Sequence, residues 1–108
     1  MMLGRLRIPP TVRKGEPFEV RVLVQHPMET GYRRDLNGQA IPLNIVDKLV
    51  CRIGGREVFS AELGSGMAAN PYIAFYAVAD QAGEVEVEWS DDRGEKGRVA
   101  VALTMESP

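Results

Sequence analysis

The sequence predicts an all-β protein, a β-sandwich of about seven antiparallel strands. Apolar residues alternate with polar residues at a period of two along most of the chain, whereas the 3.6-residue period of a helix is almost absent. Short turns rich in glycine and charged residues separate these runs at the spacing expected of a sandwich. The 108 residues, 44% hydrophobic and 26% charged, have the composition of one globular unit, so we assign residues 1–108 to a single domain.

The first half of the chain contains two predicted strands. The first covers residues 5–8 and is ended by two consecutive prolines, which cannot donate to a sheet ladder. After a turn at residues 13–16, the second strand runs over residues 17–25. Its even-numbered apolar residues share one face: Phe18, Val20, Val22 and Val24. This alternation is typical of a strand with one buried face and one wet face.

The second half contains two predicted hairpins. Residues 49–53 and 56–63 form the first, because the glycine pair between them accepts the positive φ angles of a two-residue turn. Residues 84–90 and 98–104 form the second, around a charged turn. Trp89 is in phase with the valines of its strand, so we expect it to pack in the core, where its large area contributes most.

The strand predicted at residues 72–79 is apolar on both faces. Its even-numbered face includes Tyr72 and Tyr76, although the outer face of an antiparallel sheet is normally wet. Either a loop of the same chain covers this face or another protein does, since tyrosine is enriched at protein interfaces. Residues 43–53 pose the same question: their odd-numbered apolar residues, from Leu43 onward, share one face, and two valines make the other face partly apolar.

Composition argues against several classes of partner. The net charge is −2, with 13 basic and 15 acidic residues mixed along the chain, and aromatic residues make up 6%, so nucleic-acid binding has little support. Apolar runs such as residues 73–79 are far too short to span a bilayer. The N-terminus lacks the pattern of a secretory signal, which alone favours the cytoplasm and leaves export alongside a partner open. A single cysteine excludes an intrachain disulfide.

Two residues are candidates for chemistry, and neither has the neighbours that chemistry needs. His26, the only histidine, lies in the HPMETG segment without a second histidine, a cysteine pair or a nucleophile motif elsewhere in the chain. Cys51 is in phase with Leu49 and Ile53, so we expect a buried thiol rather than an exposed, reactive thiolate. We therefore predict no catalytic residue, no metal site and no cofactor. The irregular stretches 26–42 and 64–71 are expected to be loops at the ends of the sheets, where binding is common.

Four segments in order resemble the SoxZ family of the thiosulfate-oxidising (Sox) system, from about residue 14 to residue 104. They are KGEPFEV, HPMETG followed by IPLNIV, LVCRIGGREVFSAEL, and ANPYIAFYAVA. The combination of HPMETG with ANPY is the specific part. The resemblance implies an immunoglobulin-like sandwich that is not an enzyme and that pairs with SoxY, which holds the sulfur substrate on a cysteine of its flexible C-terminal arm. It also implies transient contacts with other Sox enzymes, and a periplasmic location reached by export bound to SoxY.

The two irregular stretches and the aromatic strand are the predicted contact regions. The predicted contact residues are His26, Pro27, Met28, Glu29, Met67, Asn70, Pro71, Tyr72 and Tyr76. A purely structural role for the HPMETG loop stays open. The C-terminal ALTMESP has neither a cysteine nor a glycine run, so this chain is not predicted to carry the cargo. Two alternatives remain, an independent sulfur carrier using Cys51 and a generic immunoglobulin-like interaction domain, and the chain expressed alone could form homodimers through its apolar face.

Overall fold

The computed structural model describes residues 3–64, 67 and 69–106, and within these ranges the chain forms strands and loops. The seven strands are β1 (Leu3–Arg7), β2 (Phe18–Gln25), β3 (Val46–Ile53), β4 (Arg56–Glu62), β5 (Tyr72–Ala77), β6 (Gly83–Asp91) and β7 (Lys96–Leu103). None of the described segments is a helix long and apolar enough to cross a membrane.

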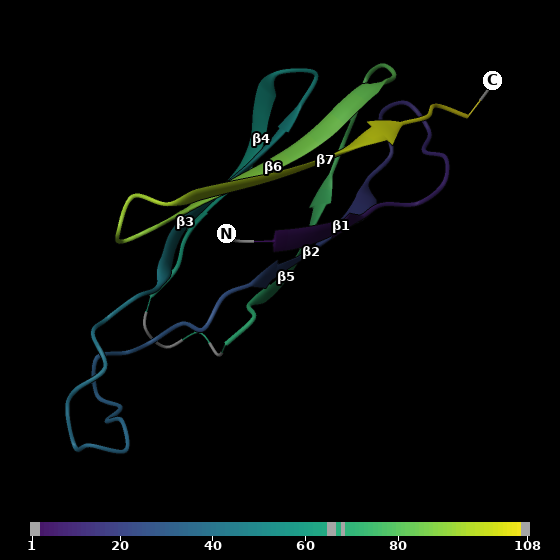
Figure 1. Cartoon of the computed structure of the whole chain (residues 1–108). Helices are drawn as coiled ribbons and strands as arrows, with labels where there is room; N and C mark the ends of the chain where they lie inside the picture. The colour runs from purple at the N-terminus through teal and green to yellow at the C-terminus, as the bar shows by residue number, and fades with distance from the viewer. Residues whose placement is uncertain (1–2, 65–66, 68, 107–108) are drawn as a thin grey trace.

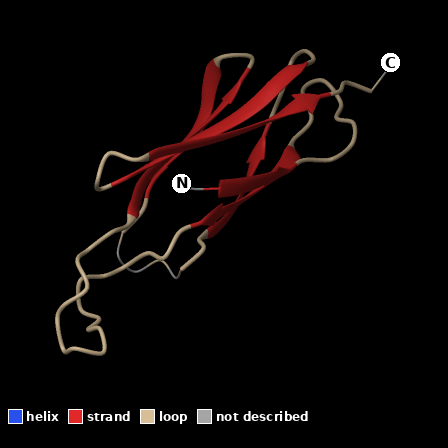
Figure 2. Cartoon of the chain, in the orientation of Figure 1, coloured by secondary structure: helices blue, strands red, loops and turns tan. Residues whose placement is uncertain are grey.

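The strands form two sheets that face each other (Figures 1 and 2). One sheet has the order β1-β2-β5, and the other has the order β4-β3-β6-β7. All five pairings between neighbouring strands are antiparallel. The predicted all-β sandwich of about seven antiparallel strands is therefore confirmed. The glycine pair also forms the expected turn between β3 and β4, with φ angles of 59° at Gly54 and 82° at Gly55.

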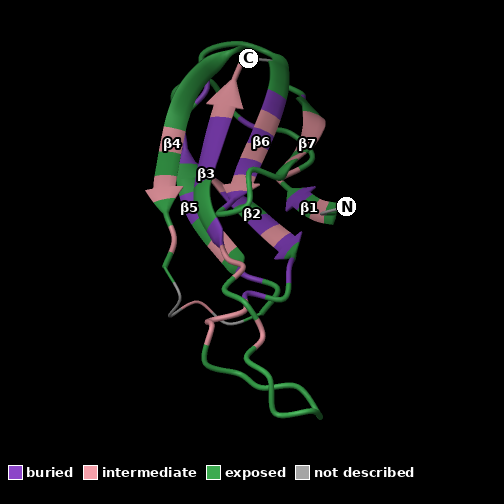
Figure 3. Ribbon diagram, turned by 60° about the vertical axis from the view of Figure 1, so that its left-hand side comes forward, coloured by how far each residue is buried: buried purple, intermediate pink, exposed green. Residues whose placement is uncertain are grey.

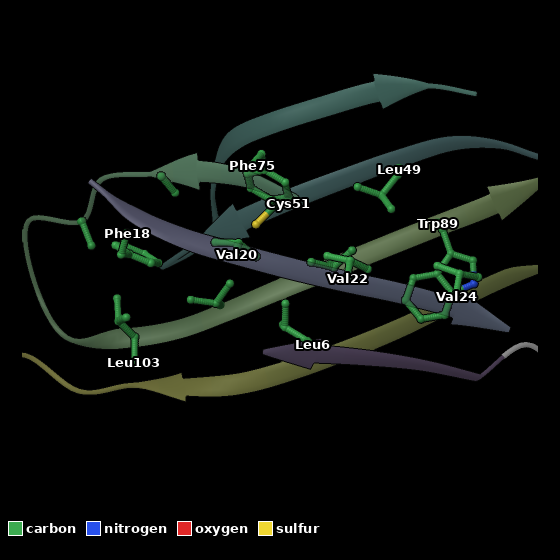
Figure 4. Packing of buried hydrophobic residues seen from close by; sticks show 14 of the residues in the cluster. Leu6, Phe18, Val20, Val22, Val24, Leu49, Cys51, Phe75, Trp89 and Leu103 are labelled. Carbon is green, nitrogen blue, oxygen red and sulfur yellow. The ribbon is translucent and has the colours of Figure 1, made fainter. Parts of the chain in front are cut away.

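The core fills the space between the sheets and comes from alternate residues of each strand. From β2 it contains the four residues that the sequence predicts: Phe18, Val20, Val22 and Val24. Figure 4 shows these side chains pointing toward Leu49 and Cys51 of β3 and Trp89 of β6. Burying one such side chain contributes about 1.5–3 kcal/mol, so the alternating pattern decides which face of each strand lies inside.

Aromatic side chains close the two long sides of the sandwich. On one side the indole of Trp89 lies between Gly97 of β7 and Gly4 of β1, where a Cβ atom at either glycine would collide with the ring. On the other side the rings of Phe59 in β4 and Phe75 in β5 stack with their centroids 3.9 Å apart and their planes 4° from parallel. These two contacts link the sheets at their edges.

The structure corrects the predicted phase at the start of residues 43–53, whereas Leu49 and Cys51 point inward as predicted. The ladder between β3 and β6 is irregular between Val46 and Lys48. Because this irregularity shifts the alternation by one residue, Val46 and Leu49 both point into the core, whereas Leu43 is exposed. The second valine of the segment, Val50, lies between the inward Leu49 and Cys51, so it keeps its predicted place on the outer face of β3, where it is 7% exposed.

Candidate partner-binding surface

β5 presents an exposed aromatic face at the edge of the three-stranded sheet. Its inward residues Phe75 and Ala77 are buried and Ile73 is half-buried, and its outward residues alternate with them as predicted. The outward side chains, which we call the tyrosine face, are Tyr72, Ala74, Tyr76 and Val78. Tyr72 is 55% exposed and Tyr76 is 69% exposed. No described segment of the chain therefore covers this face, and it is free to meet another protein.

The tyrosine face continues onto its neighbours on both sides. The register with β2 places side chains in adjacent pairs: Tyr72 with Leu23, Ala74 with Arg21, and Tyr76 with Glu19. On the other side, a groove of about 610 Å³ separates β5 from the edge strand β4. Its lining includes Val58, an exposed apolar residue of β4. Aromatic and apolar side chains gathered in this way have the composition of the core of a protein interface.

Two residues of the HPMETG segment, His26 and Met28, are buried instead of being displayed. His26 is 3% exposed and Met28 is 4% exposed. The Nδ1 atom of His26 accepts a hydrogen bond from the Met28 N–H at 2.9 Å, and the Met28 sulfur accepts one from the Val46 N–H at 3.3 Å. Met28 has a φ of 51°, which is uncommon for a residue other than glycine. The two hydrogen bonds hold Met28 in this backbone conformation, so the segment anchors the start of a loop.

The buried carboxylate of Asp91 ties this segment to the turn between β6 and β7. Its Oδ1 atom accepts hydrogen bonds from the N–H groups of Arg93 and Glu95, both at 2.9 Å. Its Oδ2 atom accepts one from the side-chain amide of Asn44 at 3.2 Å and lies 3.7 Å from Nε2 of His26, beyond direct hydrogen bonding. Because Nδ1 of His26 is an acceptor, the neutral ring carries its proton on Nε2, facing Asp91.

Residues 30–44 form a projection from the sandwich, which we call the finger (Figures 1 and 3). The turn at its tip is held by Asp35, whose Oδ1 atom accepts hydrogen bonds from the N–H groups of Asn37 and Gln39. Tyr32 is 89% exposed, and Leu36 is as exposed as in an extended chain. Neither exposed residue is among the predicted contact residues, although the turn sequence Asp-Leu-Asn-Gly is a signal that places Leu36 at a loop tip.

The second irregular stretch packs against the base of the finger, although its residues 65, 66 and 68 lie outside the described ranges. The N–H of His26 donates to Oδ1 of Asn70 at 3.0 Å, and the N–H of Asn70 donates to the carbonyl of His26 at 2.8 Å. The carbonyl of Pro71 accepts a hydrogen bond from the N–H of Val24 at 3.0 Å. The structure therefore brings HPMETG and ANPY into direct contact, although they are far apart in the sequence.

The predicted contact residues fall into two groups. Exposed or half-buried are Pro27, Glu29, Met67, Asn70, Tyr72 and Tyr76, whereas His26, Met28 and Pro71 are buried. Contact with a partner stays a prediction for the first group. The residues of the second group have almost no exposed surface, and their hydrogen bonds show that they hold the two loops in place from within the fold.

The only cysteine is enclosed in the core. Cys51 has no exposed surface, and burial raises the pKa of its thiol to about 11. At neutral pH the thiol is therefore protonated and shielded, whereas nucleophilic attack requires the thiolate. Among the described residues, no group of three or more His, Cys, Asp or Glu side chains is placed to hold a metal ion.

We expect Cys51 in the folded domain to react with a thiol probe more than about a hundredfold more slowly than an exposed cysteine at neutral pH. The reason is the raised thiol pKa together with complete burial. A colorimetric thiol titration measures the rate, with Cys51→Ala/Ser60→Cys as the exposed control, because Ser60 lies on the outside of β4. Denaturant should make the wild-type thiol fully reactive. Fast labelling of the folded chain, or a mass increase after thiosulfate treatment, would contradict this expectation.

Comparison with known proteins shows both a family and a fold. The family described as "Sulphur oxidation protein SoxZ" matches residues 6–102. No curated protein matches the chain. Among solved structures, the superoxide reductase (neelaredoxin) from Ignicoccus hospitalis is similar, with a TM-score of 0.68 and 16% identity over 95% of this chain and 80% of that chain.

Two further solved structures share the architecture. A putative superoxide reductase from Thermotoga maritima has a TM-score of 0.69 and 15% identity over 96% of this chain and 86% of that chain. A CARDB domain from Pyrococcus furiosus has a TM-score of 0.53 and 12% identity over 97% of this chain and 95% of that chain. At these identities the likeness shows a common immunoglobulin-like sandwich and nothing about activity. The family match is different in kind, because it runs from β1 to β7, and it shows that the chain belongs to the SoxZ family and is a subunit of the sulfur-oxidising Sox system.

Proposed function

We propose that this chain is the non-catalytic binding subunit of a heteromeric sulfur carrier and that it pairs with SoxY. SoxY holds the sulfur substrate on a cysteine of its C-terminal arm, and other Sox enzymes meet the pair transiently. One observation carries the proposal: the tyrosine face is open while the only thiol is enclosed. A chain with an aromatic binding face and a shielded nucleophile is suited to hold a partner and unsuited to hold the cargo.

The tyrosine face is the proposed contact with SoxY, and the finger is a second contact region. Tyr72 and Tyr76 present large, amphipathic side chains on a rigid strand, so they lose little conformational freedom on binding. The finger offers Tyr32 and Leu36 at one end of the molecule, away from the edge formed by β5. Two separate regions suit a subunit that holds one partner permanently and meets others in passing.

The proposed location is the periplasm, reached by export as a complex with SoxY. The support is membership of the SoxZ family together with the proposed pairing. Deleting the export signal of SoxY should then retain both subunits in the cytoplasm, as measured by cell fractionation. Continued export of this chain without SoxY would contradict the proposal.

We expect Tyr72→Glu/Tyr76→Glu to weaken binding to SoxY from the same organism by at least about a hundredfold. The change removes two exposed aromatic anchors and leaves the core untouched, so the free domain should keep its unfolding midpoint. Titration calorimetry measures the affinity. The matched control is Lys48→Gln/Lys96→Gln, which changes net charge equally at exposed positions of the other sheet. Equal affinity of the tyrosine variant and the wild type would rule out this face as the contact.

A further inference from the structure

Three arginines gather on the outer face of the β1-β2-β5 sheet, beside the tyrosine face. The register places Arg7 of β1 directly opposite Arg21 of β2, and it places Arg5 opposite Leu23, which is itself opposite Tyr72. Two adjacent hollows of about 230 and 270 Å³ lie on this face, and Arg7 and Arg21 line both of them. We call Arg5, Arg7 and Arg21 the arginine cluster.

The folded chain alone does not account for this cluster. Like charges directly opposite each other destabilise a sheet. Glu19 pairs with Arg21, whereas neither Arg5 nor Arg7 has an acidic partner among the described residues. The four-stranded sheet is built differently, because its outward arginines on β3 and β7 both pair with Glu86. The three-stranded face therefore keeps an excess of positive charge in a chain whose net charge is −2.

We infer that the arginine cluster and the tyrosine face form one continuous docking surface and that the protein surface it receives carries carboxylates. This rests on the proposed function, because it specifies the chemistry of the partner at the same face. Charge complementarity is the argument: unpaired guanidinium groups attract carboxylates, with which they form bidentate hydrogen bonds. Arginine and tyrosine are also the residue types that dominate interface hot spots.

A protein surface fits this face better than a free small anion. The guanidinium groups are exposed on an open sheet, and an ion pair at an exposed site is individually weak and screened by salt. Leu23 and Tyr72 border the same hollow as the arginines, which suits a ligand that has apolar groups next to its carboxylates. An acidic protein surface satisfies both requirements over several strands at once.

The two parts of the surface should act on different rate constants. The arginines carry charge that acts at a distance, so they steer the encounter and raise the association rate at low salt. The tyrosines act only in contact, so they slow dissociation. This difference allows the contribution of the arginine cluster to be separated from that of the tyrosine face.

The test is binding kinetics with purified SoxY from the same organism over a range of salt concentrations. The charge variant is Arg5→Glu/Arg7→Glu, and its control is Lys48→Glu/Lys96→Glu, which makes the same change in net charge on the other sheet. At low salt the arginine variant should associate at least about tenfold more slowly, and the control within about twofold of wild type. High salt should reduce the difference. Tyr72→Ser/Tyr76→Ser should instead raise the dissociation rate, without adding charge.

The outcomes test the inference and the proposed function separately. The arginine variant should fold at least as well as wild type, because a glutamate opposite Arg21 replaces a repulsive pair by an attractive one. If SoxY binds the wild type tightly and the arginine variant associates at the wild-type rate at every salt concentration, the inference fails and the proposed function stands. If SoxY binds neither the wild type nor any variant, the proposed function fails.

Discussion

Replacing Gly97 with alanine is expected to lower the free energy of unfolding by about 3 kcal/mol. A Cβ atom at this position would lie only 2.5 Å from Cζ2 of Trp89. The indole cannot retreat, because Gly4 of β1 lies against its other side. The added methyl must therefore displace the ring from the core or push β7 away. Thermal unfolding followed by circular dichroism should show a midpoint lower by roughly 10 °C or more.

Two further variants isolate the cause of this loss. Gly64 has open space around the position of a Cβ atom and no positive φ, so Gly64→Ala should change the free energy of unfolding by no more than about 0.5 kcal/mol. For the double variant Gly97→Ala/Trp89→Phe, the decrease in the free energy of unfolding should be smaller than the sum of the decreases in the two single variants. The difference should be about 1 kcal/mol or more, because the smaller ring makes room for the methyl. Strictly additive losses would show that contact with Trp89 is not the reason.

Asp91→Ala is expected to lower the free energy of unfolding by about 3 kcal/mol, as for other buried polar networks that lose a charged member. The change removes the acceptor for two backbone N–H groups in the turn between β6 and β7. It also leaves the side-chain amide of Asn44 and Nε2 of His26 facing a cavity. Because these groups hold the base of the finger, hydrogen exchange at Arg93, Glu95 and Asn44 should accelerate together.

The matched control is Asp47→Ala. Asp47 is an exposed aspartate whose side chain accepts one long hydrogen bond, from Ser90 at 3.5 Å. The Asp47→Ala change should lower the free energy of unfolding by no more than about 0.5 kcal/mol and leave hydrogen exchange in the finger unchanged. If Asp91→Ala were as mild as this control, the carboxylate would not be the anchor of the finger.

Local patterns in the sequence predicted most of the fold. The alternation in β2 and β6 is a direct record of burial, because a strand with one wet face permits apolar residues only at every second position. For the same reason the inward position of Cys51 and the outward position of Tyr76 followed from their phase within the strand. The inward position of Val46 at the start of β3 did not follow, because the ladder irregularity beside it depends on how β3 pairs with β6 and leaves no mark in the composition of the strand.

The features of the candidate site that the sequence did not predict depend on contacts between residues that are far apart in the chain. Asp91 looked like an ordinary residue of a charged turn, yet it is buried against His26. A histidine in a loop suggested a displayed side chain, whereas its ring is enclosed by segments distant in the sequence. Periodicity describes one strand at a time, so it cannot show which loops meet at the end of a sandwich. The arginine cluster was hidden for the same reason, since it forms only when β1 and β2 align.

The position of Trp89 gives the protein a built-in optical reporter. It is the only tryptophan in the chain, and its indole lies in the core between two glycines, 1% exposed to water. Its fluorescence emission should therefore be blue-shifted in the folded state and move to longer wavelength only when the two sheets separate. Binding of a partner to the outer face of β5 should leave the emission spectrum of Trp89 unchanged. A fluorescence measurement can therefore distinguish a variant that unfolds from a variant that only fails to bind its partner.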